Sequence, residues 1–311
     1  MGGRIEASWL STRRAADARA RDASLPLVQS LANHLAAISA IAASQAAVHI
    51  VDVGAGTGAN ADWLAPRLRS ALTGAGVGRW AHHWYLLDHD PDLLAARHLN
   101  LPARDVQLSE HVGGLSDVAA LLAVQGRPRV LTCSALLDLL TPDEITELVT
   151  DTVRSADGAL FALSVTGAIA LDPADEQDYV VSDLFNAHQQ ARRTGGARRG
   201  TTPTDSGPAG PAGWTYAVGA FEAAGWRVQQ VATPWRLGPA ARDLSNRLLS
   251  ERSQAAAEMA PDAHTRGLVE GWLARRLHQL DDQGLGVRVD HMDVLALPPR
   301  STSVQMSSPN G

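Results

Sequence analysis

The chain of 311 residues contains no lysine and a single cysteine, Cys133, and only 5% of its residues are aromatic. One cysteine excludes a disulfide within the chain and a zinc site built from several thiolates, so we predict no metal site. The formal net charge of -6 gives no general attraction to a phosphate backbone. We therefore expect a small-molecule partner, and a nucleic-acid partner is unlikely on these grounds.

Long apolar runs are also missing. The sequence has no stretch of about 20 apolar residues that could span a bilayer, and no secretory leader pattern. These absences predict no membrane partner and a cytoplasmic location, whereas the oligomeric state stays unknown. Apolar residues nevertheless make up 45% of the chain, which is enough for the core of one sizeable α/β domain with additions.

The most informative feature that is present is a glycine-rich turn between a strand pattern and a helix pattern. Residues 48–51 form a short apolar run typical of a buried parallel strand, and residues 61–72 carry leucines at helical spacing. Between them stand Gly54, Gly56 and Gly58, which let the backbone turn sharply and let a ligand approach closely. The helix that follows offers free N–H donors, so this strand, turn and helix predict a cofactor loop.

The carboxylate of Asp52 bears on which cofactor binds. A dinucleotide fingerprint fits the turn, because Gly54, Gly56 and Ala59 satisfy G-x-G-x-x-G/A. Asp52, however, lies two residues before the first glycine, at the carboxyl end of the predicted strand. A negative charge there would repel a pyrophosphate and would pair with an ammonium group. S-adenosylmethionine carries such an ammonium, so Asp52 favours this cofactor.

A second acid occurs after the next strand pattern. Residues 82–87 are followed by Asp88, His89 and Asp90-Pro91. The carboxyl ends of adjacent parallel strands share one crevice, where an acid can accept both hydroxyls of a ribose. Asp88 lies about 30 residues beyond the glycines. In dinucleotide-binding folds the corresponding acid lies roughly 20 residues beyond them. Asp90 and its proline predict the start of a helix over residues 92–100.

The rest of the chain continues the alternation of strands and helices. Further strands are predicted at residues 106–112, 130–134, 159–166, 226–233 and 289–297. Thr141-Pro142-Asp143-Glu144 predicts the start of a helix between two of them. The pattern indicates an α/β fold with a doubly wound, seven-stranded Rossmann-like sheet that ends in an antiparallel pair. N-terminal helices precede the first strand, and a helical insertion at 240–283 precedes the last one.

The D-x-G-x-G-x-G pattern of Asp52, Gly54, Gly56 and Gly58 resembles the first motif of class I S-adenosylmethionine-dependent methyltransferases. Nearly the whole chain is similar to an actinobacterial group of such enzymes of small-molecule type. The resemblance implies the methyltransferase arrangement of the sheet, S-adenosylmethionine as cofactor, and methyl transfer to N, O or C of an unidentified acceptor. Residues 134–140 lack the Asn/Asp-Pro-Pro-aromatic signature of enzymes that methylate exocyclic base nitrogens, which argues against that subclass.

The same comparison of patterns suggests the site residues. The expected cofactor contacts are Asp52, Gly54, Ala55, Gly56, Gly58, Asp88, His89, Asp117 and Ser134. The expected substrate contacts are Asp138, Asn186, Gln189 and Trp235. His188 is the candidate general base, because an imidazole with a pKa of about 6.5 can accept a proton at neutral pH. A histidine on a polar helix is usually a solvated surface residue, which is the alternative for His188.

Three larger questions stay open at this point. Residues 1–46 form either a lid over the cofactor or a helical preface packed outside the sheet, and residues 47–311 form the cofactor-binding domain with a mobile, basic, glycine-rich loop at 192–213. An NAD-dependent oxidoreductase remains an alternative function. A noncatalytic protein that binds S-adenosylmethionine is another, because the sequence does not separate it from an enzyme.

Overall fold

The computed structural model describes residues 6–42, 47–76, 80–101, 105–124, 126–191, 207–282 and 284–299. Its strands are β1 (Ala47–Val53), β2 (Ala81–Asp88), β3 (Val106–Val112), β4 (Arg129–Ser134), β5 (Gly158–Asp172), β6 (Arg227–Ala232), β7 (Trp235–Leu237) and β8 (Gly286–Leu297). Its α-helices are α1 (Ala7–Arg21), α2 (Leu25–Ala42), α3 (Ala59–Gly74), α4 (Pro91–Ala95), α5 (Val118–Val124), α6 (Pro142–Ser155), α7 (Asp178–Gln190), α8 (Gly213–Ala223), α9 (Arg242–Met259) and α10 (Ala263–Asp281). Residues 192–206, most of the predicted loop at 192–213, lie outside this description.

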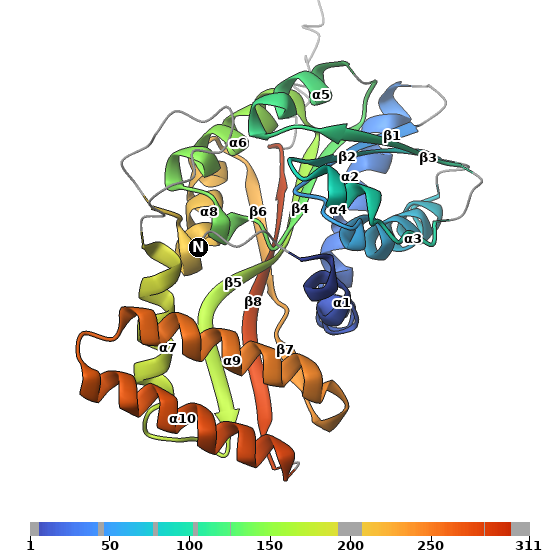
Figure 1. Cartoon of the computed structure of the whole chain (residues 1–311). Helices are drawn as coiled ribbons and strands as arrows, with labels where there is room; N and C mark the ends of the chain where they lie inside the picture. Colours follow the sequence, from blue (N-terminus) through green and yellow to red (C-terminus); the bar gives the residue numbers. More distant parts are fainter. Residues whose placement is uncertain are drawn as a thin grey trace, which may run out of the picture.

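The strands form one eight-stranded sheet in the order β3-β2-β1-β4-β5-β8-β6, with β7 paired to β8 (Figure 1). Pairing is parallel from β3 to β5, and β8 runs antiparallel to both β5 and β6. The predicted fold class and its final antiparallel pair are therefore confirmed. Strand β7 has three residues, too few to show an alternating pattern in the sequence.

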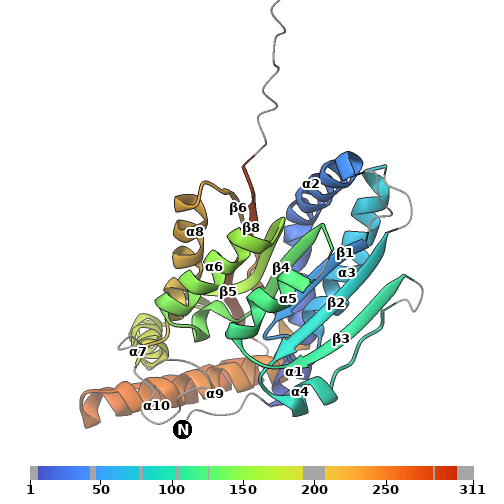
Figure 2. The same ribbon diagram turned by 90° about the horizontal axis from the view of Figure 1, so that it is seen from above.

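Helices cover both faces of the sheet. On one face, Leu31 and Leu35 of α2 and Leu64 and Leu68 of α3 pack in one fully buried cluster with strand residues such as Ile50. On the other face, side chains of α5, α6 and α8 pack against β1, β4 and β5. Figure 2 shows α2 and α3 side by side along the sheet. Two-sided burial explains why the parallel strands read as nearly continuous apolar runs.

The strand β5 is longer than the predicted strand at residues 159–166. It continues to Asp172. With β8 it forms a ribbon beyond the main sheet, and α7, α9 and α10 pack on this ribbon (Figure 1). A third apolar cluster joins these parts, with Leu249, Trp272 and Val287 among its buried members. The predicted helical insertion at 240–283 corresponds to the pair α9 and α10. None of the described helices combines the length and apolar character that a membrane span requires.

The helix predicted over residues 92–100 is too long. Its predicted cap is confirmed, because the Asp90 carboxylate accepts the Asp92 N–H at 2.9 Å, but α4 ends at Ala95. The following residues turn back onto the glycine turn and α3. The His98 N–H donates to the Thr57 carbonyl at 3.2 Å, and the Asn100 N–H donates to Asp62 at 2.7 Å. These tertiary contacts replace the hydrogen bonds that a longer helix would make.

Candidate active site

The glycine turn between β1 and α3 has a backbone that only glycine adopts readily. Gly54, Gly56 and Gly58 all have positive φ, and a Cβ at Gly58 would lie 2.6 Å from Cδ2 of Leu99. A Cβ at Gly56 would lie 3.1 Å from Cδ1 of Leu10, which belongs to α1. Side chains from two distant segments therefore cover the turn, and the turn has room for them because it lacks side chains of its own.

The structure brings Asp88 to this turn. Its carboxylate accepts the Gly56 N–H at 2.8 Å and the Asp90 N–H at 2.9 Å, and its side chain is buried. His89 follows it, with Nδ1 3.3 Å from the Asp88 carboxylate and a side chain exposed to solvent. Asp117 lies at the same edge of the sheet and caps a short turn by accepting the Gly114 N–H at 2.8 Å. The N–H of Ala55 donates to the Leu87 carbonyl, which ties the turn to β2.

Asp52 is fully buried and only partly satisfied. Its Oδ1 accepts a hydrogen bond from Nδ2 of Asn60 at 2.6 Å, whereas its Oδ2 has no hydrogen-bond partner among the described residues. Burial raises the pKa of Asp52 to about 7, which outweighs the opposing effects of the Asn60 hydrogen bond and of the Arg21 charge. A buried carboxylate oxygen without a donor is costly, so this position is suited to a cationic or hydrogen-bonding ligand group.

Arg21, the last residue of α1, is a buried cation that complements the Asp52 carboxylate. Its role was not predicted from the sequence. Its Nη1 donates to Oδ1 of Asn60 at 2.6 Å, and its guanidinium lies 4.0 Å from the centre of the Trp63 ring. Its Nε is 3.9 Å from the buried Asp293. Both Nε and Nη2 lack a hydrogen-bond partner among the described residues, although the side chain is only 2% exposed.

A small cavity of about 140 Å³ lies between α1, α3, the end of β4 and Leu163 of β5. It is lined by Arg14, Asp17, Ala18, Arg21, Ala59, Asn60, Asp62, Trp63, Arg67, Ser134 and Leu163. Typical pockets for whole small molecules have volumes of about 300 Å³ or more, so this one has room for an end group only. Ser134, a predicted cofactor contact, lines it together with Arg21 and Asn60. The cavity therefore offers unused donors of a guanidinium beside the amide that also binds Asp52.

The predicted substrate contacts lie on several elements. Asp138 is in a turn after β4, and Asn186 of α7 donates to the Gly167 carbonyl at 3.3 Å. Gln189, one turn further along α7, has a buried side-chain oxygen without a partner among the described residues. Trp235 is 3% exposed, and its indole N–H donates to Asp17 of α1 at 3.0 Å. It thus holds α1 against the β7–β8 edge, while its role toward a substrate stays a prediction.

His188 lies at the surface between α7 and α9. Its side chain is 39% exposed, and its Nε2 is 3.1 Å from a carboxylate oxygen of Glu258. The described contacts of His188 do not include residues of the glycine turn or of the cavity beside it. The general-base role therefore stays a prediction, and the ion pair with Glu258 offers a structural reason for the residue.

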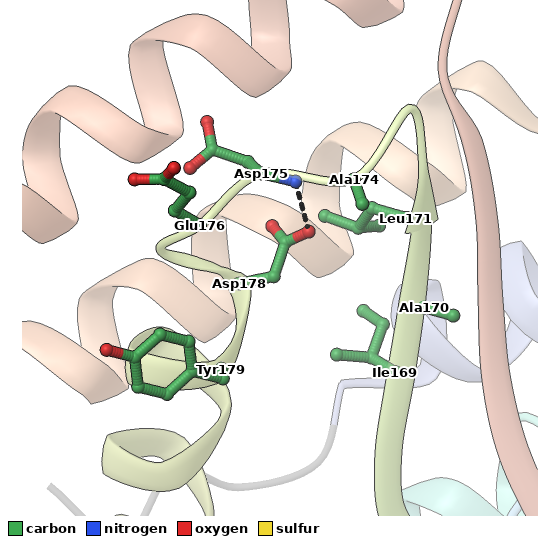
Figure 3. Close-up of a pocket in the computed structure, with 8 residues that line it drawn as sticks. All are labelled: Ile169, Ala170, Leu171, Ala174, Asp175, Glu176, Asp178 and Tyr179. Atoms are coloured by element: carbon green, nitrogen blue, oxygen red, sulfur yellow. Dashed lines mark hydrogen bonds between the residues drawn. The ribbon is translucent and has the colours of Figure 1, made fainter.

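A larger hollow of about 610 Å³ lies on the ribbon, away from the glycine turn. Figure 3 shows its lining residues from the end of β5 and the start of α7, with Tyr179 and Ile169 on opposite sides. Asp178 accepts the Asp175 N–H at 2.9 Å there. None of the predicted cofactor residues lines this hollow, so it is distinct from the crevice.

One comparison with a solved structure supports the fold. Neither a protein-family model nor a curated protein matches the chain. Among solved structures, a loganic acid methyltransferase with SAH is similar over 96% of this chain and 99% of its own, with 12% sequence identity and a TM-score of 0.50. A cyclopropane-fatty-acyl-phospholipid synthase-like protein from Lactobacillus casei covers 87% of this chain and 92% of its own at 13% identity, with a TM-score of 0.44. The first similarity, together with the strand order, shows that this chain has the Rossmann-like fold of methyltransferases.

Proposed function

We propose that this protein is an S-adenosylmethionine-dependent methyltransferase that transfers a methyl group to N, O or C of a small-molecule acceptor. The observation that supports this most is the buried Asp52, whose second carboxylate oxygen has no partner among the described residues. Asp52 lies directly before a glycine turn that a second acid, Asp88, contacts. The cofactor's ammonium and ribose are the groups that these two acids suit.

The residues around the cavity fit the methionine end of this cofactor. That end carries an ammonium and a carboxylate. Arg21 lines the cavity with guanidinium donors, and Asp52, which bonds to the cavity residue Asn60, has a carboxylate oxygen; these atoms have no partner among the described residues. The side-chain amide of Asn60 bonds to both residues, so the two charges lie on either side of one group. A dinucleotide has no ammonium to offer Asp52, and its pyrophosphate would face a negative charge. The site therefore favours S-adenosylmethionine over NAD.

When bound, the cofactor supplies an electrophilic methyl group: a lone pair of the acceptor forms the new bond to carbon, and the electrons of the breaking C–S bond stay on sulfur, leaving S-adenosylhomocysteine. The chain's own contribution is to bind and orient, and correct placement alone accounts for much of the acceleration of such reactions. Asp52 and Arg21 hold the amino-acid end, and Asp88 holds the ribose. The acceptor proton, where there is one, leaves to water or to a nearby base.

The helix α1 forms part of the proposed site, and we propose that it serves as its cover. Leu10 lies over Gly56, Arg21 reaches the amide of Asn60, and Trp235 binds Asp17 near the middle of the helix. A helix held at three places excludes water from the crevice beneath it, which protects the reacting groups. Ligand entry then requires α1 to shift from these contacts.

Calorimetric titration with S-adenosylhomocysteine tests the proposal, with NAD as the competing ligand. We expect micromolar binding of S-adenosylhomocysteine, weakened at least tenfold in Asp52→Asn and in Asp88→Asn. The matched control is Asp282→Asn, whose side chain is 67% exposed at the end of α10, and it should bind as the original chain does. Binding of NAD without binding of S-adenosylhomocysteine would overturn the proposal.

An acceptor screen separates an enzyme from a noncatalytic binding protein. The chain would be incubated with labelled S-adenosylmethionine and pools of small organic acids, amines and phenols, and labelled products would be detected by mass spectrometry. A product that disappears in Asp52→Asn supports the enzyme. Tight cofactor binding with no labelled product from any pool would favour a noncatalytic role.

A further inference from the structure

A buried arginine outside the proposed cofactor site has no counterion among the described residues. Arg252 of α9 is 3% exposed, and none of the described carboxylates forms an ion pair with it. Its Nε has no hydrogen-bond partner among the described residues, and its Nη2 reaches the Gly167 carbonyl only at 3.5 Å. Its guanidinium lies 4.1 Å from the centre of the Phe185 ring. Burial alone lowers the pKa of Arg252 to about 10, which leaves it charged at neutral pH.

A second arginine in the same helical layer shows what a structural ion pair looks like here. Arg276 of α10 is fully buried, and its Nη2 lies 2.6 Å from both carboxylate oxygens of Asp178. Its Nη1 also donates to the Pro173 carbonyl at 2.7 Å. The fold thus supplies a complete set of acceptors to Arg276 and not to Arg252. A buried charge without a counterion is costly, so a residue of this kind is expected to acquire a partner of opposite charge.

One polar side chain near Arg252 donates to the same acceptor. Asn186 donates to the same Gly167 carbonyl at 3.3 Å, so an amide and a guanidinium share one acceptor at long distances. The lack of a side chain at Gly167 leaves space for this approach, because a Cβ there would lie 2.9 Å from Nδ2 and 3.1 Å from Oδ1 of Asn186. Two donor-bearing side chains therefore converge on one carbonyl at long distances, and an oxyanion there would accept from both. The atom of Asn186 that lacks a partner among the described residues is its Oδ1.

This cluster is within reach of the crevice. Gly167 lies on β5 four residues beyond Leu163, which lines the cavity beside Asn60. At about 3.3 Å per residue, the two positions are at most about 13 Å apart along the strand. This separation is within the length of one small organic molecule.

We propose that Arg252, assisted by Asn186, binds a carboxylate or phosphate group of the methyl acceptor. The planar guanidinium favours such groups, because its parallel N–H bonds match the two oxygens of an oxyanion. The acceptor is then an organic anion whose methylated atom lies several bonds from its negative group. This assignment of acceptor class rests on the proposed methyltransferase function, whereas the oxyanion site itself is measurable without any cofactor.

The test compares thermal unfolding of the original chain, Arg252→Met and Arg276→Met in sodium chloride, acetate and phosphate at equal ionic strength. In the original chain we expect acetate or phosphate to raise Tm by about 3 °C or more, with saturation at millimolar concentration. Whichever anion acts at lower concentration identifies the carboxylate or the phosphate as the preferred group. The general salting effect of phosphate does not saturate and is the same in every variant, so it can be subtracted.

The two methionine variants should differ in their effect on Tm in chloride and in their response to the anions. Arg252→Met removes an uncompensated charge and should keep or raise Tm in chloride while abolishing the saturable response to the anions. Arg276→Met leaves the Asp178 carboxylate without its ion-pair partner, and it should lower Tm while the anion response persists. As a variant that keeps the charge, Arg252→Lys should weaken the response at least several-fold, because an ammonium lacks the planar fork.

A lower Tm of Arg252→Met in chloride together with an unchanged response to the anions would overturn the assignment, as would a lack of any saturable response in the original chain. Calorimetry with S-adenosylhomocysteine on the same samples keeps this result separate from the proposed function. If the original chain does not bind S-adenosylhomocysteine, the methyltransferase proposal fails. If it binds S-adenosylhomocysteine but shows no saturable response to the anions, only the Arg252 proposal fails.

Discussion

Arg21 and Asp52 bind opposite ends of one side-chain amide: Nη1 of Arg21 donates to Oδ1 of Asn60, and Nδ2 of Asn60 donates to Oδ1 of Asp52, both at 2.6 Å. The amide separates a buried cation from a buried anion that would otherwise pair directly. Each residue also has side-chain atoms without a hydrogen-bond partner among the described residues. The stability of the chain and its affinity for the cofactor should therefore depend on both charges.

The first prediction concerns the stability cost of Asp52. Its pKa is about 7 in the folded chain against an ordinary value of 3.8, so the folded state retains a proton that the unfolded state releases. The contribution of Asp52 to stability therefore falls as the pH rises from about 4 to 7, by an amount of the order of 4 kcal/mol. Asp52→Asn should unfold at a higher temperature than the original chain at pH 8, with little difference at pH 4.5. Equal differences at both pH values would contradict this account.

The second prediction concerns the pH dependence of cofactor binding. An ammonium group binds the charged form of Asp52, so the affinity for S-adenosylhomocysteine should rise by up to tenfold per pH unit from pH 5.5 to about 7 and then level off. Calorimetry in a single buffer series measures it. Asp52→Asn should bind weakly with no such slope, and a slope that persists in this variant would assign the titration to another group.

The third prediction isolates Arg21. Arg21→Met should weaken binding of S-adenosylhomocysteine at least tenfold, because the cofactor's carboxylate loses a charged donor. Binding of 5′-methylthioadenosine, which lacks the amino-acid end, should change far less. Arg69→Met is the matched control, since Arg69 also lies on α3 but pairs with Asp105 at 3.3 Å and is not among the residues that line the cavity. Equal losses for both ligands would mean that Arg21 acts on the fold and not on the carboxylate.

The fourth prediction concerns the covered glycine turn. Gly58→Ala should lower the free energy of unfolding by about 1–3 kcal/mol, because Gly58 has a φ of +80° and its new Cβ meets Leu99. Gly74→Ala, at the end of the same helix with nothing within 4 Å of its Cβ, should be neutral or slightly stabilising. The double variant with Leu99→Ala separates the two causes, since it relieves the clash and leaves the backbone strain. Denaturant unfolding measures all four chains.

The agreement between sequence and structure is closest where the signal is local. The glycine turn, the strands on either side of it and the caps at Asp90 and Thr141 depend on neighbouring residues, and each is present. Asp88 also lies against the turn, because parallel strands align their carboxyl ends. The limits of α4 and the existence of β7 were not predictable in this way. The first depends on contacts with Thr57 and Asp62, and the second on pairing with β8.

The sequence by itself therefore determined the α/β class, the order of the elements and the position of the glycine turn, because hydrophobic period, glycine conformation and helix caps act over a few residues. Only the tertiary structure decided which charges are compensated. Arg252 and Arg276 are both arginines in long helices, and nothing in their local sequence separates them. Folding places Asp178 beside one and leaves the other without a carboxylate among the described residues. Partners separated by many residues in the chain set the energy of a buried charge, so the candidate contacts at Arg21 and Arg252 emerge only when the chain is folded.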